Sequence, residues 1–103
     1  MAVVVAIAAD SALSASGTLT SRCLARDAEF PRGVGVLQYA CTGQVQIDVE
    51  FSLDGVSWVS KQTIAAGTTS GLVPIEMVFA PMMRIKATEK AGASATVGVL
   101  VDC

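Results

Sequence analysis

The carboxylates at positions 48, 50 and 54 are the side chains that come nearest to a chemical site. Asp48 and Glu50 lie two residues apart, and paired carboxylates across a cleft carry out glycoside hydrolysis. An alternating strand would instead place both on one polar, solvated face, and this interpretation is favoured. Asp54 could bind calcium, but such a site needs about six oxygens, and the following Gly55 favours a turn.

This chain offers few residues for nucleophilic catalysis or for metal binding. It has no histidine, the usual general base near neutral pH and the commonest metal ligand. Cys23, Cys41 and Cys103 lack CxxC spacing, so we expect buried or free thiols. A disulfide between Cys41 and Cys103, both at strand ends, is the less favoured alternative. The sequence therefore predicts no catalytic residue, no metal, no cofactor and no enzyme activity.

Trp58 is the only tryptophan and could act as a stacking platform for a sugar ring. A sugar-binding face usually presents several exposed aromatic rings, whereas aromatic residues make up only 5% of this chain. We therefore expect Trp58 to fill the core beside Phe51 and Tyr39. Exposure of Trp58 and Tyr39 on one face would favour carbohydrate binding instead.

Two cations, Arg84 and Lys86, project from the same face of a predicted strand. They are expected to pair with Glu76 across a sheet, or with acids of a neighbouring subunit. An exposed ion pair contributes only about 0–1 kcal/mol, so its role would be in register or partner choice.

The elements that must position these residues are strands. From Val45 to Leu53 apolar and polar residues alternate, which is typical of a half-buried antiparallel strand. Asp54-Gly55 then supplies a turn, and the chain restarts as a strand that carries Trp58. No helical period persists, and turn signals recur at strand spacing. The sequence predicts an all-β antiparallel sandwich or jelly roll in a single domain, residues 1–103.

About eight strands are expected, with hairpins over 44–64 and 82–102. The strand over 34–42 is apolar enough to be central, and Pro74 indicates an edge strand because it cannot donate to the ladder. Residues 10–17, 26–32 and 65–71 are expected to be loops. The predicted strands span 2–9, 18–25, 34–42, 44–53, 57–64, 72–79, 82–88 and 95–102.

The composition indicates an interface. Hydrophobic residues make up 52% of the 103 residues and charged residues 16%, although alanine and glycine in the core also inflate the apolar fraction. A small domain has much surface per unit volume, so surplus apolar residues reach the outside unless a partner covers them. The net charge of −2, without a basic cluster, argues against nucleic acid, and no apolar run is long enough to span a membrane.

The first predicted strand, Ala2–Ala9, is apolar on both faces, so one sheet of the same monomer can hardly cover it. It lacks the basic region of a signal peptide, and we expect cytoplasmic synthesis without secretion. The apolar face expected to cover neighbouring subunits contains Val3, Val5, Ile7, Leu72 and Val73, whereas Asp54, Gly55 and Trp58 are expected to be structural.

Residues 51–58 (FSLDGVSW) and 80–88 (APMMRIKAT) together resemble a small β-sandwich family of phage virion proteins, the capsid decoration or cement proteins. A similar pattern occurs in discoidin-like and carbohydrate-binding sandwiches. The resemblance covers residues 45–102 and implies an eight-stranded sandwich, a homo-oligomer (often a trimer) and a place on the outer face of a capsid. It carries over no catalytic residue.

We therefore expect a structural virion protein that binds and stabilises an assembled phage capsid. Its expected partners are the major capsid protein and its own copies, and its expected location is the capsid surface after synthesis in the host cytoplasm. The alternative is a carbohydrate-binding module or receptor-binding tip domain. An enzyme is the least favoured class.

Overall fold

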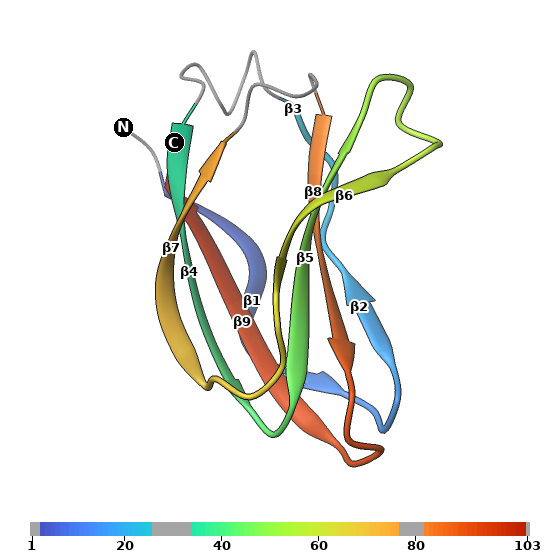
Figure 1. Ribbon diagram of the computed structural model, residues 1–103, viewed down its shortest axis with the longest axis vertical. Helices are drawn as coiled ribbons and strands as arrows, with labels where there is room; N and C mark the ends of the chain where they lie inside the picture. The colour runs from blue at the N-terminus through green and yellow to red at the C-terminus, as the bar shows by residue number, and fades with distance from the viewer. Residues whose placement is uncertain (1–2, 26–33, 77–81, 103) are drawn as a thin grey trace.

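The described part of the chain forms nine strands in two antiparallel sheets (Figure 1). The computed structural model describes residues 3–25, 34–76 and 82–102. These residues include no helix, and so no helical segment suited to crossing a membrane. One sheet has four strands, in the order β1 (Val3–Leu13), β9 (Ala95–Asp102), β4 (Val34–Thr42) and β7 (Ser70–Glu76). The second contains β2 (Thr18–Thr20), β3 (Leu24–Ala25), β8 (Met82–Glu89), β5 (Val45–Ser52) and β6 (Val59–Ile64).

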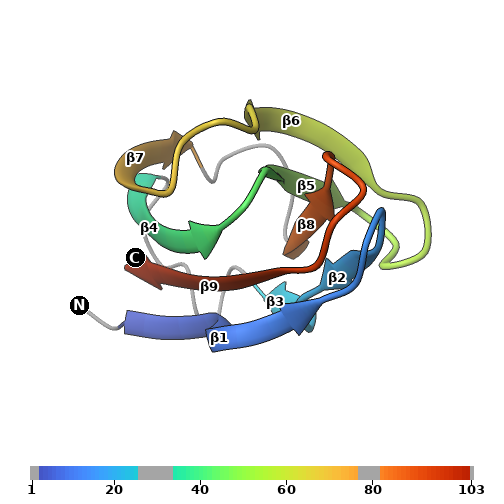
Figure 2. The same ribbon diagram turned by 90° about the horizontal axis from the view of Figure 1, so that it is seen from below.

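The strand pairs are nested in the manner of a jelly roll. β1 pairs with β9, β2 and β3 with β8, β4 with β7, and β5 with β6. The pairs β4–β9 and β5–β8 then complete the two sheets, which form opposite walls of the molecule (Figure 2). The predicted all-β antiparallel sandwich or jelly roll is confirmed, as are the central position of β4 and the edge position of Pro74 in β7.

The core lies between the sheets and is built from alternate residues of each strand. One inner row crosses the four-stranded sheet from Val4 through Val101 and Leu37 to Val73. Val101 and Leu37 in its middle are fully buried, whereas Val4 and Val73 at its ends are half-buried. The opposite wall contributes the buried side chains of Leu24, Val45, Ile47, Val49, Phe51, Met83, Ile85 and Ala87.

Several predicted boundaries are wrong for identifiable reasons. β8 and β9 do not form a hairpin, because the chain crosses from one sheet to the other between them. β1 continues to Leu13 through the region expected to be a loop, with Asp10 at a positive φ of 58°. The single strand expected over 18–25 is divided in two, and Ser21 bridges the break by exchanging two hydrogen bonds with the backbone of Ile85. Residues 77–79, expected to extend β7, lie outside the described residues.

Candidate functional site

The outer surface of the four-stranded sheet carries two adjacent rows of mostly apolar side chains. One row runs from Val5 through Leu100 and Gln38 to Leu72, and the other contains Val3, Val36 and Pro74. Leu72 is 69% exposed and Val3 64% exposed, although both belong to regular strands. We call the following six residues the outer apolar face: Val3, Val5, Val36, Leu72, Pro74 and Leu100.

The sequence produces this face because three of the four strands are apolar at consecutive positions. Runs such as Val3-Val4-Val5 place one valine in the core and its neighbours outside, since side chains alternate across a sheet. Within their described bounds, the four strands contain no lysine or arginine, and their acids are Asp10, Glu76 and Asp102. The result is an apolar surface without positive charge.

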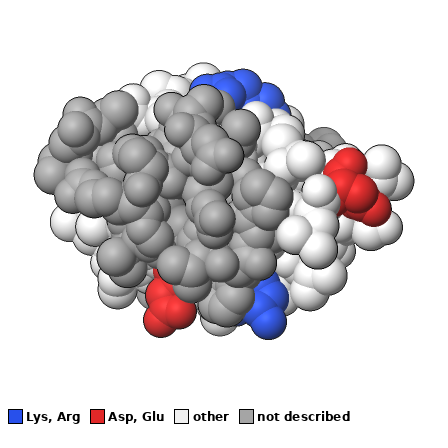
Figure 3. All heavy atoms as spheres, turned by 90° about the horizontal axis from the view of Figure 1, so that it is seen from above, with Lys and Arg blue, Asp and Glu red and all other residues white. Residues whose placement is uncertain are grey.

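In the view from above, the charged residues do not gather in a patch of one sign (Figure 3). Viewed from above, the visible cations and acids are dispersed around the margin of the described surface (Figure 3). The described cations lie in the second sheet or in loops: Arg22, Lys61, Arg84, Lys86 and Lys90. The outer apolar face gathers five of the exposed large hydrophobic residues on one sheet, whereas Leu53, Val56 and Val59 are exposed around the turn after β5.

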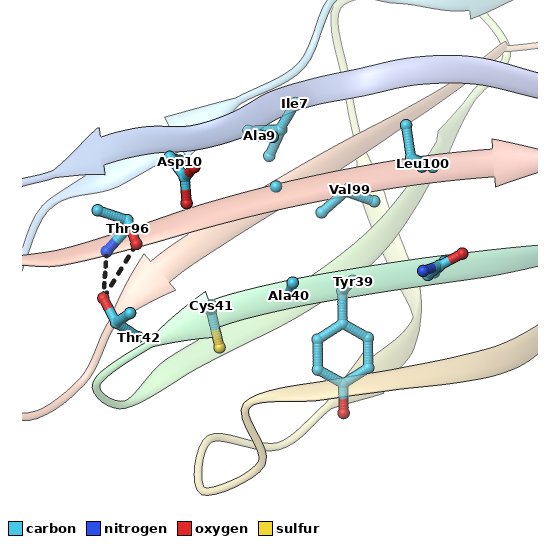
Figure 4. Close-up of a pocket in the computed structure, with 12 residues that line it drawn as sticks. Ile7, Ala9, Asp10, Tyr39, Ala40, Cys41, Thr42, Thr96, Val99 and Leu100 are labelled. Atoms are coloured by element: carbon cyan, nitrogen blue, oxygen red, sulfur yellow. Dashed lines mark hydrogen bonds between the residues drawn. The ribbon is translucent and has the colours of Figure 1, made fainter.

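A shallow groove of about 280 Å³ continues the outer apolar face toward the other end of the sheet (Figure 4). Its floor is low because Gly98 and Ala40 stand opposite each other there. A side chain at position 98 would meet the Cα atom of Ala9 at 2.8 Å, so glycine permits the close approach of β1. Thr42 and Thr96 close one end through a hydrogen bond of 3.0 Å between their hydroxyls. The floor of the groove is thus formed by small residues, and the hydroxyls at its end are already paired with each other.

The expected interface residues divide between the two faces of the sheet. Val3, Val5 and Leu72 belong to the outer apolar face, as an interface role requires. Ile7, in contrast, is 4% exposed and belongs to the core, because its register partner is the inward-facing Val99. Val73 is half-buried and also packs against the core. The prediction for Ile7 and Val73 as surface residues is wrong.

Val36, Pro74 and Leu100 are members of the outer apolar face that the sequence reasoning missed. Each is the direct sequence neighbour of a buried residue, because Val36 precedes Leu37, Pro74 precedes Ile75 and Leu100 precedes Val101. The signal was present in the runs 34–37 and 97–101, where apolar residues do not alternate with polar ones. The register across β4 was needed to show that these residues lie beside Val3 and Leu72.

Asp48 and Glu50 are not on a solvated face, contrary to expectation. They are 9% and 8% exposed, because β5 lies between β8 and β6 and neighbouring side chains cover it. Asp48 accepts hydrogen bonds from the hydroxyls of Ser60 and Thr63 and from the amide of Gln46. Their oxygens are thus engaged within the sheet, and no group of three or more candidate metal ligands gathers among the described residues.

Arg84 pairs with Glu50 rather than with Glu76. Its Nε lies 2.7 Å from Glu50 Oε1 on the neighbouring strand, whereas Glu76 belongs to the other sheet. The guanidinium also lies over the ring of Trp58, 4.4 Å from its centroid. Trp58 is half-buried by this contact and is not part of the core, so the prediction that it packs beside Phe51 and Tyr39 is wrong.

The turn after β5 is braced as the Asp54-Gly55 pair predicts. Asp54 Oδ1 accepts hydrogen bonds from the backbone N–H groups of Val56 and Ser57 and from the Ser52 hydroxyl. The bond from Ser57, followed by that from Val56, holds the pKa of Asp54 below its ordinary value. Gly55 has a φ of 76°, which L side chains rarely adopt. Asp54 and Gly55 therefore act in the turn.

The described cysteines are thiols. Cys23 is exposed, and Cys41 is buried, donating to the carbonyl of Thr68. Burial raises the pKa of the Cys41 thiol. The expectation of buried or free thiols is met at both positions, and Cys41 takes no part in the alternative disulfide. Cys103 lies outside the described residues.

No protein-family model matches this sequence, and no curated protein matches it. Among solved structures, the chain is similar to the crystal structure of PBSX exported protein XepA, with a TM-score of 0.77 and 9% sequence identity. The alignment covers 98% of this chain and 36% of that protein, so the chain spans about a third of its length. At this identity the likeness shows a shared all-β fold.

Proposed function

We propose that this chain is a structural protein of a phage particle, and that it binds an assembled capsid as a decoration or cement protein. The outer apolar face is the observation that carries the proposal. It lies on strands whose other side already forms the core, so folding of the monomer does not account for its exposed side chains. A protein partner does account for them, because burying apolar surface drives association.

The shape of the surface supports a broad, flat contact. The six residues of the outer apolar face occupy two rows across four strands spaced at about 4.8 Å, which gives a face of roughly 200–300 Å². Together with the matching area on a partner, this stays well below the roughly 1,000 Å² of a stable specific interface. Each contact would be weak alone, but many copies on a lattice would stabilise a shell together.

The solved neighbour supports the phage assignment at a coarser level. PBSX exported protein XepA is a phage-associated protein, and it shares the fold across nearly the whole of this chain. The proposed partners are the major capsid protein and further copies of the chain, and the proposed location is the capsid surface. We propose a role without catalysis, in keeping with a sequence that has no histidine.

The alternative, a carbohydrate-binding module or receptor-binding tip, depended on Trp58 and Tyr39 sharing an exposed face. Tyr39 belongs to the core between the two sheets and is 5% exposed. Trp58 precedes β6 in the other sheet and is covered by Arg84. The ring arrangement that would favour sugar binding is therefore not formed by these two residues, and capsid binding is favoured.

Cosedimentation with assembled capsids of the phage that encodes the chain tests the proposal. The protein should pellet with assembled capsids and remain in the supernatant alone. Because the proposed contact is apolar, binding should persist when salt is raised from about 0.15 to 0.5 M, where exposed charge pairs are largely screened. Failure to pellet with capsids at micromolar concentration would overturn the assignment to the capsid. Release of the bound protein by the salt step would overturn the apolar mechanism of binding.

A further inference from the structure

We propose that two copies of this chain pair antiparallel through the free edges of their β1 strands, joining two four-stranded sheets into one. β1 pairs with β9 along one side, and no described strand pairs with its other side. In Figure 2, β1 forms the lower margin of the molecule. An edge strand presents N–H and C=O groups that can pair with another strand.

The other sheet edges carry features that oppose such pairing, and β1 does not. β7 contains Pro74, which lacks an N–H donor, and β6 contains Lys61, a charge on an edge strand. β2 and β3 are only three and two residues long. Residues 3–9, in contrast, read VVVAIAA, without charge or proline. β1 is therefore the edge on which an added strand meets least opposition.

A cleft of about 300 Å³ lies beside the middle of β1, where residues 5–8 and Ser11 face residues 19–22. Val3 and Val4 do not line this cleft, and no described strand pairs with their other side. Register shifts interrupt β1 after Val5 and again between Ile7 and Ser11. Pairing is therefore expected over the N-terminal part of β1, before the strand bends.

A second copy fits this edge because antiparallel pairing of identical strands is symmetric about a twofold axis, and one segment supplies both sides. The valines at positions 3–5 favour extended backbone, and the pair would extend the outer apolar face across both copies. This arrangement gives a dimer, rather than the trimer that the family resemblance implies. It does not depend on capsid binding, since a monomer would still present its own outer apolar face.

Two matched substitutions test the pairing. Val4 and Val73 are the half-buried ends of the same inner row, one on β1 and the other on β7. A lysine on an edge strand opposes pairing of that edge. Val4→Lys should lower the dimer association constant by about tenfold or more, while Val73→Lys, with the same change at the opposite edge, should leave it unchanged. Sedimentation velocity between micromolar and submillimolar concentrations measures both.

A wild-type protein that stays monomeric throughout, or that forms a trimer, would overturn the proposal. A dimer that forms equally well with Val4→Lys would also contradict the proposal. The same holds if a folded Val73→Lys variant weakens the dimer as much as Val4→Lys does. If the Val4→Lys variant does not fold, hydrogen exchange of the wild-type protein tests the pairing of β1 instead. Amides of residues 3–5 should become more protected as concentration rises, while those of β7 should not change. Equal behaviour of the two edges would contradict the pairing.

Discussion

Val5 in β1 and Leu72 in β7 stand at opposite ends of one row of side chains that crosses the four-stranded sheet through Leu100 and Gln38. The row lies on the outer surface, and its two end residues are 54% and 69% exposed. Directly behind it runs the inner row that contains Val101 and Leu37, both fully buried. The sheet is thus apolar on both sides, and only one side is used by the fold of the monomer.

Substitutions at neighbouring positions of β1 should separate core from surface. Ile7→Ala should lower the free energy of unfolding by about 2–4 kcal/mol, because the side chain is buried against the core. Val5→Ala should change it by only about 0.5 kcal/mol or less, because Val5 is on the outer apolar face. Urea unfolding followed by circular dichroism measures both. Similar losses at the two positions would contradict the register of β1 against β9.

The turn after β5 should depend on the conformation of Gly55. Gly55→Val should destabilise the protein by about 1–3 kcal/mol, because a β-branched residue at positive φ is strained. An added Cβ would also lie 3.2 Å from the Met82 sulfur. Gly55→Asn is the matched control, since asparagine tolerates the left-handed region, and it should cost less. Equal thermal midpoints for the wild type and the valine variant would show that the turn does not require glycine.

The carboxylate of Glu89 should make the stability depend on acid pH. The N–H of Ser16 above all, together with those of Ala91, Gly92 and Ala93, lowers its pKa from the ordinary 4.5. Its contribution is therefore complete above about pH 4.5, and it is lost as the pH falls through the lower folded-state pKa.

Glu89→Gln should therefore reduce stability at neutral pH and flatten its decline below pH 4.5. Glu76→Gln, at an exposed position, is the control and should leave both the midpoint and its pH dependence nearly unchanged. Urea midpoints between about pH 3 and 7 measure these effects. An unaltered pH profile for Glu89→Gln would show that the loop contacts of Glu89 do not contribute.

Trp58 should behave as a covered surface residue. Leu37→Ala should cost about 2–5 kcal/mol, as expected for a fully buried leucine, whereas Trp58→Ala should cost nearer to 1 kcal/mol. Arg84→Ala should shift the Trp58 emission toward that of water-exposed indole, because the guanidinium covers the ring. A larger loss for Trp58→Ala than for Leu37→Ala would restore the core position that the sequence suggested.

Local sequence signals predict the presence of most strands and the Asp54-Gly55 turn, but not every strand boundary. The alternation over 45–53 predicts β5 well, although Leu53 lies beyond the strand and is 77% exposed. Local signals could not show which strands share a sheet. Met82–Glu89 and Ala95–Asp102 are joined by a short connection, yet they belong to opposite sheets, because the nested pairing of β1 with β9 is a long-range relationship.

An exposed apolar face could be predicted in kind but not in membership. The excess of apolar residues indicates an exposed apolar surface, yet in strands that are apolar on both sides alternation does not reveal which side faces the core. The register shift between Val5 and Ile7 turns the side chain of Ile7 toward the core. The local sequence pattern does not predict this shift. The prediction of a solvated polar face on β5 is wrong because residues distant in the sequence cover it. Arg84 covers Glu50, and β6 covers Asp48.

Titration of assembled capsids with Leu72→Asp and Leu53→Asp tests the central claim most directly. Both leucines are highly exposed, at 69% and 77%, but Leu72 is on the outer apolar face and Leu53 is in the loop after β5. Leu72→Asp should weaken capsid binding by about tenfold or more, since a charge would be buried at the contact, while Leu53→Asp should bind like the wild type. Wild-type affinity for a folded Leu72→Asp variant would contradict the assignment of this face to the capsid.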